Sequence, residues 1–474
     1  MTTAEHADDR VISASEVADP YALHLDYARS APSTLGARFK YLGPGMLMSA
    51  AVVGSGELIT TTSMGSKAGF ALMWLIIVST AAKLFIQMEL AKISIVTGEP
   101  GLKVFGRVPV RFGKASWINV LWILMDFAKM LQRGGIIGGA VAALSLLFPV
   151  VGDPLSTGSL TAWTAIALVI IVGVNVTNRY QLIERAAFIL VVTFTLITVA
   201  LVLSLPGTEF GWTGGDVVSG LSFQIPLGAA GLAIAVFGLT GVGADEMTTY
   251  TYWCIEKGYA RWTGPNDGSP EWTARAKGWI KVMQLDLVIA WVITTVCTVS
   301  FYIMGAAVLH PQGLHPEGNE LIKILSHMYT DTLGPWAEYL FLIGAVGVLG
   351  STFLASTASV PRLWANNLSV LGVFKWENVK LRTRLIRIFT IVMPIIWAAT
   401  YLGLQAPLIM VVIGGFGSAI FLVAVVAAVL YLRKRTVASE FVTPRSSILL
   451  GISTIAVLFV ALTSFLELFG VNIA

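Results

Sequence analysis

The residues that could do chemistry in this sequence are charged side chains placed inside apolar segments. Glu57 closes the run Gly54-Ser55-Gly56-Glu57 near the middle of one such segment, and Asp245 and Glu246 follow a second glycine-rich stretch, Thr240-Gly241-Val242-Gly243. Carboxylates can bind cations or exchange protons. An ionisable group at the centre of a bilayer costs about 3 kcal/mol, so each of these groups is expected to have a partner or a role in transport.

A third apolar segment adds cations to these carboxylates. Asp126, Lys129 and Arg133 are spaced by three and four residues, so they share one face of a helix. Lys83 and Gln87 are related in the same way in the preceding segment. Two interpretations stay open: the charges form a buried salt-bridge network that only holds helices together, or they face a watered path and bind a substrate.

The sequence lacks the signatures of common enzyme classes. No GxSxG, HExxH, Walker or dinucleotide-binding motif lies in a suitable context. Cys254 and Cys297 are far apart and do not have the spacing of a zinc site. None of the five histidines falls in residues 43–62, 117–148 or 226–256. We therefore expect a protein that is not an enzyme, has no permanently bound cofactor and does not bind nucleic acid.

The composition identifies the elements that must position these groups. Of the 474 residues, 56% are hydrophobic and 12% are charged, and the mean hydropathy is +0.78. Such a chain is an integral membrane protein whose main partner is the lipid bilayer, and apolar runs along nearly its whole length favour a single transport domain. The eleven expected helices span residues 43–62, 70–97, 117–148, 159–178, 183–205, 226–256, 279–308, 335–360, 385–403, 406–432 and 446–471.

The basic residues predict how the chain is oriented. The loops after the second, fourth, sixth, eighth and tenth helices hold most of the loop Lys and Arg, whereas segments 149–158, 206–225 and 404–405 hold none. By the positive-inside rule the N-terminus is cytoplasmic, and the odd helix count places the C-terminus outside. We expect a location in the plasma (inner) membrane, with residues 1–40 as a mobile cytoplasmic tail.

Two of the expected helices carry closely spaced glycines at their centres, at residues 54–56 and 238–243. Glycine weakens a helix interior by about 1 kcal/mol relative to alanine, so the helix can open there and offer its backbone to a ligand. Breaks in helices one and six predict an all-α, LeuT-type five-plus-five inverted repeat with the substrate site between the two broken helices. The repeats are expected at 41–205 and 226–435, followed by an appended eleventh helix at 446–471.

An alternative is that such glycines only permit close helix packing. The third helix carries four more glycines to which this interpretation applies, namely Gly134, Gly135, Gly138 and Gly139.

The order of several motifs resembles the Nramp family of divalent metal transporters over nearly the whole hydrophobic chain. Gly43-Pro44-Gly45-Met46-Leu47-Met48-Ser49 resembles the family's GPGFLMS at the start of helix one. Further resemblances lie at Ala68-Gly69-Phe70 with Trp74, at Gln87 through Val96-Thr97-Gly98, and at Lys281 to Asp286, in place of the family's RIDT-like element. The resemblance implies a secondary-active membrane transporter with that family's fold.

The functional motifs of the family are altered in this chain. Gly54-Ser55-Gly56-Glu57 stands where the family has Asp-Pro-Gly-Asn, and Val242-Gly243-Ala244 stands where it has Met-Pro-His. The family's Asp-Leu-Ala-Glu proton path is Asp126-Phe127-Ala128-Lys129 here. The resemblance therefore implies a divergent member without the soft thioether, the histidine or the usual proton route.

These changes favour a hard ion. Loss of a thioether beside surviving carboxylates favours Mg²⁺, and smaller side chains leave room for the ligands that Mg²⁺ keeps. The cations of helices two and three would repel a bare metal ion, so we expect the ion to travel with a small organic carboxylate such as citrate. The expected metal ligands are Glu57 and Asp245. The expected substrate-binding residues are Gly54, Ser55, Gly56, Glu57, Thr60, Lys83, Lys129, Arg133, Thr240, Gly241 and Gly243.

Other substrates stay open at this point. One is free or hydrated Mg²⁺ or Mn²⁺, and another is an amino acid or organic anion without metal. A channel is disfavoured, because paired broken helices suit alternating access better than a continuous pore. The coupling ion is also open: a proton could act through Asp126 or Glu57, Na⁺ could bind carbonyls near Gly54 and Gly241, or neither could take part.

Overall fold

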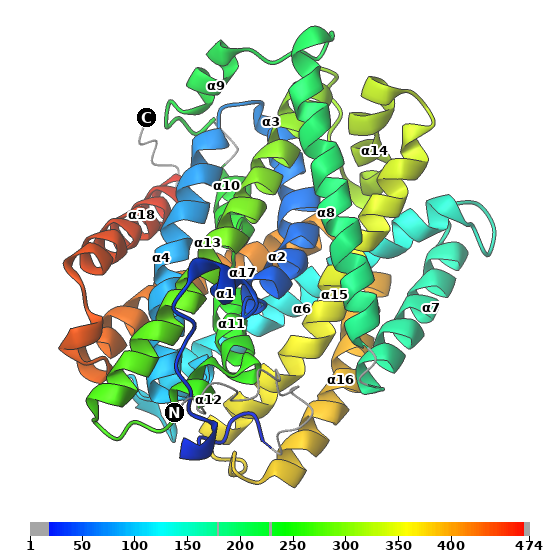
Figure 1. Cartoon of the computed structure of the whole chain (residues 1–474). Coiled ribbons are helices and arrows are strands. Elements are labelled where there is room, and N and C mark those ends of the chain that lie inside the picture. The colour runs from blue at the N-terminus through cyan, green and yellow to red at the C-terminus, as the bar shows by residue number, and fades with distance from the viewer. Residues whose placement is uncertain (1–18, 178–179, 227–229, 469–474) are drawn as a thin grey trace, which may run out of the picture.

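The computed structural model describes the backbone of residues 19–177, 180–226 and 230–468, which form one helical bundle (Figure 1). Within these ranges, nine helices are long and apolar enough to cross a membrane. They are α4 (Met73–Thr97), α6 (Trp117–Leu147), α7 (Thr157–Val176), α8 (Tyr180–Ser204), α13 (Pro270–Met304), α15 (Ala337–Val370), α16 (Val379–Leu404), α17 (Pro407–Thr436) and α18 (Pro444–Leu468).

The other two predicted helices are interrupted, as the glycines indicated. The first consists of α2 (Pro44–Val52), η3 (Val53–Thr61) and α3 (Thr62–Ala68), and the sixth consists of α10 (Ala230–Leu239) and α11 (Ala244–Lys257). Our expectation of an opened first helix needs correction, because η3 is a π-helix rather than unwound chain. A π-helix bonds each residue to the fifth one along, so the backbone widens while remaining paired at membrane depth.

Glycine also allows close helix packing in this bundle. A side chain at Gly54 would overlap Thr352 and the Val348 carbonyl of α15, and one at Gly134 would overlap Thr400 of α16 and lie within 2.8 Å of the Trp397 carbonyl. The packing interpretation is thus confirmed for the third helix, where Gly135 and Gly138 meet Pro407 and Tyr401 in the same way. In the first helix, packing and interruption occur together.

A buried carboxylate fixes where the first helix begins. Asp286 of α13 accepts hydrogen bonds from the backbone N–H groups of Gly43 (3.0 Å) and Gly45 (2.5 Å) and from the Tyr250 hydroxyl (2.9 Å). The first N–H groups of a helix have no partner within the helix, so this contact satisfies two of them. It also ties α2, α11 and α13 together at one end of the bundle.

Short elements connect the long helices. Arg111–Phe112 (β1) and Ala115–Ser116 (β2) form an antiparallel hairpin that the sequence did not predict. Four short helices lie at the end of the bundle that holds the N-terminal segment: η2 (Leu25–Tyr27), α1 (Leu35–Phe39), α5 (Gly101–Phe105) and α12 (Tyr259–Thr263). A fifth, η7 (Ser439–Phe441), connects α17 to α18. The remaining ones are η4 (Leu205–Gly207), α9 (Gly214–Gly220), η5 (Gly305–Leu309), η6 (Gly318–Glu320) and α14 (Leu321–Leu333).

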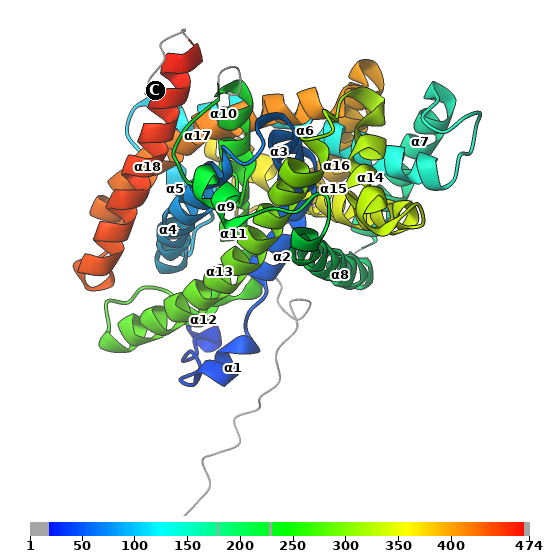
Figure 2. The same cartoon turned by 90° about the horizontal axis from the view of Figure 1, so that it is seen from above.

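The two interrupted helices lie inside the bundle. Seen from above, α18 and α7 lie at opposite edges, whereas α2, α10 and α11 lie between them (Figure 2). The α6 helix packs against α15 and α17, and α10 packs against α17. The charged side chains of Lys83 on α4, of Asp126, Lys129 and Arg133 on α6, and of Asp245 on α11 are buried in the protein interior.

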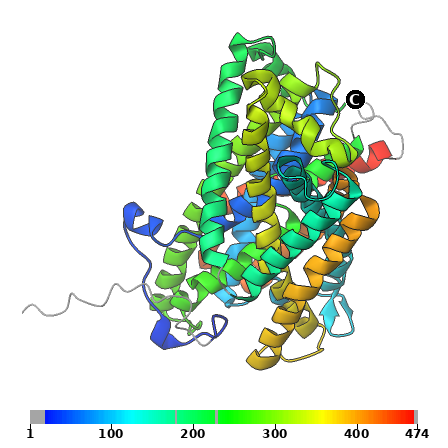
Figure 3. The ribbon, with the colours of Figure 1, turned by 90° about the vertical axis from the view of Figure 1, so that its right-hand side faces the viewer.

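The N-terminal segment differs from the predicted mobile tail. Residues 19–42 lie against one end of the bundle (Figure 3). Asp19 forms an ion pair with Arg382 of α16 at 2.7 Å, and the Tyr21 hydroxyl donates to Glu256 of α11 at 2.6 Å. The Arg29 guanidinium lies 4.1 Å from the ring centroid of Trp262. These contacts hold the segment from Asp19 onward, while residues 1–18 of the predicted tail lie outside the described residues.

Candidate functional site

Glu57 lies where the two interrupted helices meet. Its side chain is fully buried. One carboxylate oxygen, Oε1, accepts hydrogen bonds from the backbone N–H of Gly241 (3.1 Å) and from the Thr298 hydroxyl of α13 (2.8 Å). Gly241 has φ of 72°, a left-handed conformation that glycine adopts without strain. Among the described residues, the other oxygen, Oε2, has no hydrogen-bond partner.

Lys83 of α4 contacts the interruption of the sixth helix at the C-terminal end of α10. Its ammonium group donates to the carbonyl oxygens of Phe237 and Thr240, the latter at 2.8 Å. These carbonyls end α10, where the last C=O groups of a helix have no intrahelical partner and the helix dipole is negative. Lys83 therefore caps this half-helix in the present conformation. The Thr240 hydroxyl donates to Ser79 of α4 at 2.9 Å, which strengthens the same junction.

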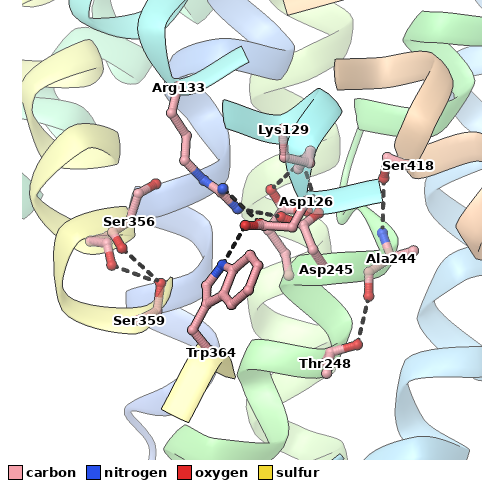
Figure 4. A network of polar contacts seen from close by, with 12 residues as sticks. Asp126, Lys129, Arg133, Ala244, Asp245, Thr248, Ser356, Ser359, Trp364 and Ser418 are labelled. Atoms are coloured by element: carbon pink, nitrogen blue, oxygen red, sulfur yellow. Dashed lines mark hydrogen bonds and ion pairs between the residues drawn. The ribbon is translucent and has the colours of Figure 1, made fainter. Parts of the chain in front are cut away.

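A network of five charged side chains connects α6 to the start of α11 (Figure 4). The Lys129 ammonium lies 2.8 Å from Asp245 Oδ1 and 3.1 Å from Glu246 Oε1. Arg133 lies 2.7 Å from Asp126 Oδ1 and 3.5 Å from Asp245 Oδ2. Both cations are therefore neutralised by carboxylates, and both of them bind Asp245.

Two further contacts hold this network in place. Trp364 of α15 donates its indole N–H to Asp126 Oδ2 at 2.6 Å. Ser418 of α17 accepts from the Ala244 N–H at 3.1 Å and donates to the Gly238 carbonyl at 3.0 Å, so it bridges the two halves of the sixth helix. Asp245 and Glu246 lie in the first turn of α11, where the helix dipole favours negative charge.

Two small cavities adjoin these groups. One, of about 20 Å³ open to the centre of a water molecule, is lined by Ser49, Thr80, Lys83 and Gly241, among others. The second, of about 30 Å³, is lined by Lys129, Arg133, Asp245 and Glu246, among others. A cavity needs about 10 to 15 Å³ of such volume for one water molecule, so each has room for about one to three waters.

The other predicted substrate-binding residues lie in environments that differ from one residue to the next. The Thr60 hydroxyl donates to the Gly56 carbonyl at 2.9 Å. Gly54 packs on α15, and Gly243 precedes α11 with Glu246 and Ser418 so near that a side chain would overlap them. The side chain of Ser55 lies outside the described residues.

The prediction therefore divides into two groups. Glu57, Thr240 and Gly241 share one junction with Lys83, whereas Lys129, Arg133, Asp126 and Asp245 form the network beside it. In the described part of the chain, three or more His, Cys, Asp or Glu side chains never gather in a group able to hold a metal ion.

Sequence reasoning missed four hydrogen-bonding residues. Ser79, Thr298 and Trp364 each bind a predicted residue, and Ser418 binds Ala244, which lies between the predicted Gly243 and Asp245. Hydroxyl and indole groups are common in apolar helices. Only the spacing of Ser79 and Lys83, four residues apart on one helix face, carried a usable signal.

The sequence matches one family model. The model described as Natural resistance-associated macrophage protein-like (Nramp) matches residues 45–467. The divalent metal cation transporter MntH of Deinococcus radiodurans is 25% identical over 474 residues, covering 95% of this chain and 97% of its own. MntH of Mycobacterium tuberculosis is 23% identical over 76% of this chain and 77% of its own.

Solved structures show the same fold at lower identity. A mutant of the Eremococcus coleocola manganese transporter superposes with a TM-score of 0.61 at 17% identity, covering 96% of this chain and 93% of that one. A nucleobase-cation-symport-1 family transporter with bromovinylhydantoin bound gives 0.52 at 14% identity, covering 92% and 94%. The predicted LeuT-type architecture is confirmed by these likenesses.

Proposed function

Because the chain belongs to the Nramp family, we propose that it is a membrane transporter of divalent metal cations whose substrate site lies between its two interrupted helices. Members of this family are transporters rather than enzymes. The proposal extends to the substrate: a hard divalent ion, Mg²⁺ in the first place, carried together with a small organic carboxylate such as citrate. The protein would reside in the plasma (inner) membrane with its N-terminus in the cytoplasm.

The half-satisfied carboxylate of Glu57 is the observation that carries this proposal. Its Oε1 is held by Gly241 and Thr298, and its buried Oε2 has no partner among the described residues. A buried oxygen that keeps its charge without a partner loses the solvation it had in water. A cation bound at Oε2 would restore that stabilisation.

The scarcity of protein ligands favours a cation that brings ligands of its own. Mg²⁺ prefers six oxygen ligands and commonly keeps several waters. One carboxylate oxygen, with Asp245 as a second ligand, leaves most of these positions to water or to a chelating carboxylate. A transition metal stripped of its waters would need a larger group of protein ligands than the described residues gather.

The charge network supplies partners for the carboxylate part of the substrate. Lys129 and Arg133 now bind Asp245, and substrate carboxylates could take its place. Asp245 would then be released to bind the metal. Bidentate binding of carboxylate is what the planar guanidinium of Arg133 does well. Lys83 would take part only if it left the carbonyls of α10.

Transport requires a conformational change from the present arrangement. The two cavities have room for only about one to three waters each, so a chelated ion needs the interrupted helices to move apart. Coupling to protons could proceed through Asp126, because its protonation would break the ion pair with Arg133. Coupling to Na⁺ would instead use backbone carbonyls near the helix breaks.

The competing substrates make different demands on this site. Free hydrated Mg²⁺ or Mn²⁺ accounts for Glu57 and Asp245 but gives Lys129 and Arg133 only a structural role. An amino acid or organic anion without metal accounts for the cations and leaves the free oxygen of Glu57 unused. The metal–carboxylate complex is the one substrate of the three that uses both.

Isothermal titration calorimetry of the purified full chain tests the proposal. Mg²⁺ alone, citrate alone and the premixed pair are injected into the wild type, Glu57→Gln and Lys129→Met. Tight binding of only the premixed pair, weakened in both variants, is expected. Binding of Mg²⁺ alone that survives Lys129→Met would return the protein to free-cation transport, and binding of citrate alone would assign it to organic anions.

A further inference from the structure

A third cavity lies at the end of the bundle that carries the N-terminal segment. Its volume of about 270 Å³ open to the centre of a water molecule is much larger than that of the two inner cavities. It lies among α7, α15 and α16, of which α7 and α16 pack side by side. Its polar lining includes Asn175, Glu256, Arg362, Arg382, Thr383 and Arg387.

One face of α16 supplies most of this lining. Thr383, Arg387 and Thr390 are four and three residues apart, the spacing that places side chains on the same side of a helix, and Arg382 lines the cavity beside Thr383. Arg382 is buried, paired with Asp19, and stacked at 4.8 Å from the ring centroid of Trp376. The wall of the cavity is therefore built from ordered side chains.

Among the described residues, Arg387 is the positive charge of this cavity that forms no ion pair with an acidic group. The two nearby carboxylates are already engaged: Glu256 binds Arg362 at 2.8 Å and Tyr21 at 2.6 Å, and Asp19 binds Arg382. In the described part of the chain Arg387 has no ion pair, and its side chain is exposed. An anion entering the cavity would meet its guanidinium, which donates to phosphate in a bidentate manner.

The surface next to Arg387 is apolar. Ile391 and Ile395 follow it by four and eight residues on the same helix face and are 40% and 48% exposed. On the neighbouring α7, Val169 and Ile170 are 72% and 53% exposed. Exposed apolar side chains on helices that span a membrane contact lipid chains. The cavity thus combines a cationic end with a lipid-facing flank.

We propose that this cavity binds the phosphate group of an anionic phospholipid from the leaflet at the N-terminal end of the bundle. Arg387 holds the phosphate, Thr383 and Asn175 supply neutral hydrogen bonds, and the acyl chains lie along Ile391 and Ile395. The exposed Lys380 and Arg384 add attraction to a negatively charged membrane surface. The site does not involve the transported substrate, so its test is independent of the test of the proposed function.

Equilibrium binding of a fluorescent phosphatidylglycerol to the detergent-purified full chain tests this inference. Phosphatidylglycerol is expected to bind at least tenfold more tightly than phosphatidylcholine. Arg387→Gln is expected to weaken phosphatidylglycerol binding by about tenfold, the loss of a hydrogen bond to a charged group. Arg384→Gln is the matched control, because Arg384 is exposed on the same helix but does not line the cavity; its expected effect is below about fivefold.

Three results would overturn the inference. Equal losses in the two variants would mean diffuse attraction to the basic end of α16. Equal affinity for phosphatidylcholine would mean that the headgroup is not recognised. In the third result, inorganic phosphate binds alone with the same dependence on Arg387, and it displaces no more lipid from the wild type than from Arg387→Gln. The cavity would then be a site for free anions rather than for a phospholipid.

Discussion

At the scale of single residues, Glu57 is the buried carboxylate on which the proposed function depends most. Replacement of Glu57 by Gln is expected to weaken binding of the premixed Mg²⁺ and citrate by about tenfold or more, because an amide oxygen is a poorer ligand for a hard cation. Stability should change little, since the amide can still accept from Gly241 and Thr298. Calorimetry and thermal unfolding of the variant measure the two effects.

Thr298→Val is the control for this residue. It removes one hydrogen bond to the same oxygen of Glu57 and should cost about 1 kcal/mol of stability while leaving the free oxygen in place. If Glu57→Gln bound the premixed ligand as the wild type does, Glu57 would not be a ligand of the metal.

The charge network gives a second prediction at the residue scale. Removing one member of a buried ion pair leaves the other charge without compensation, which costs about 3 to 5 kcal/mol. Lys129→Met should therefore destabilise the protein strongly, because Lys129 is 1% exposed and binds both Asp245 and Glu246. Unfolding monitored by tryptophan fluorescence gives the change in stability.

A surface ion pair provides the comparison for Lys129. Lys67 and Glu317 lie 3.1 Å apart with side chains 38% and 68% exposed, so Lys67→Met should cost less than about 1 kcal/mol. Asp245→Asn should restore part of the stability lost in Lys129→Met. A double variant no more stable than the sum of the two single changes would mean that the pair is not energetically coupled.

At the scale of elements, the sequence predicted the helices well because each long helix needs a long apolar run. It also located both interruptions, at Gly54 to Glu57 and at Thr240 to Gly243. It could not distinguish an unwound break from a π-helix, because both need flexible glycine. The chosen form depends on what packs against it, here Thr352 and Val348 of α15.

The sequence predicted the ion-pair partners of these charges less well, because the partners also depend on how the helices pack. Asp126, Lys129 and Arg133 were expected on one helix face from their spacing alone. The binding of Lys129 and Arg133 to Asp245, 112 or more residues further along, depends on how α6 and α11 pack. The role of Lys83 as a cap on α10 also required the three-dimensional arrangement.

Close packing of the π-helix on α15 leads to a prediction about that element. An alanine at Gly54 would overlap Thr352 and the Val348 carbonyl, so Gly54→Ala should destabilise the protein by about 1 to 3 kcal/mol. Gly350 on α15 has open space around it, so Gly350→Ala should be neutral or stabilising by up to about 1 kcal/mol. Thermal unfolding of both variants measures the difference. Equal stability of the two would mean that the contact between η3 and α15 is loose.

At the scale of the whole molecule, the two ends of the bundle are built differently. At one end the N-terminal segment connects α11, α15 and α16 through Tyr21, Asp19 and their partners. The opposite end carries α9 above the bundle (Figure 1). Movements that open the substrate site toward the first end must therefore displace or carry the N-terminal segment, whereas opening toward the other end leaves it in place.

The proposed orientation of these ends is tested by labelling with a membrane-impermeant maleimide. The native Cys254 and Cys297 are fully buried, so background labelling should be low. A cysteine replacing Glu209, which is exposed just before α9, should react in intact cells. A cysteine replacing Lys114, which is exposed in the β1–β2 hairpin, should react only after the cells are permeabilised. The physical reason is the excess of basic residues at the hairpin end, which favours retention in the cytoplasm. Labelling in the reverse pattern would invert the orientation, and with it the leaflet assigned to the phospholipid site near Arg387.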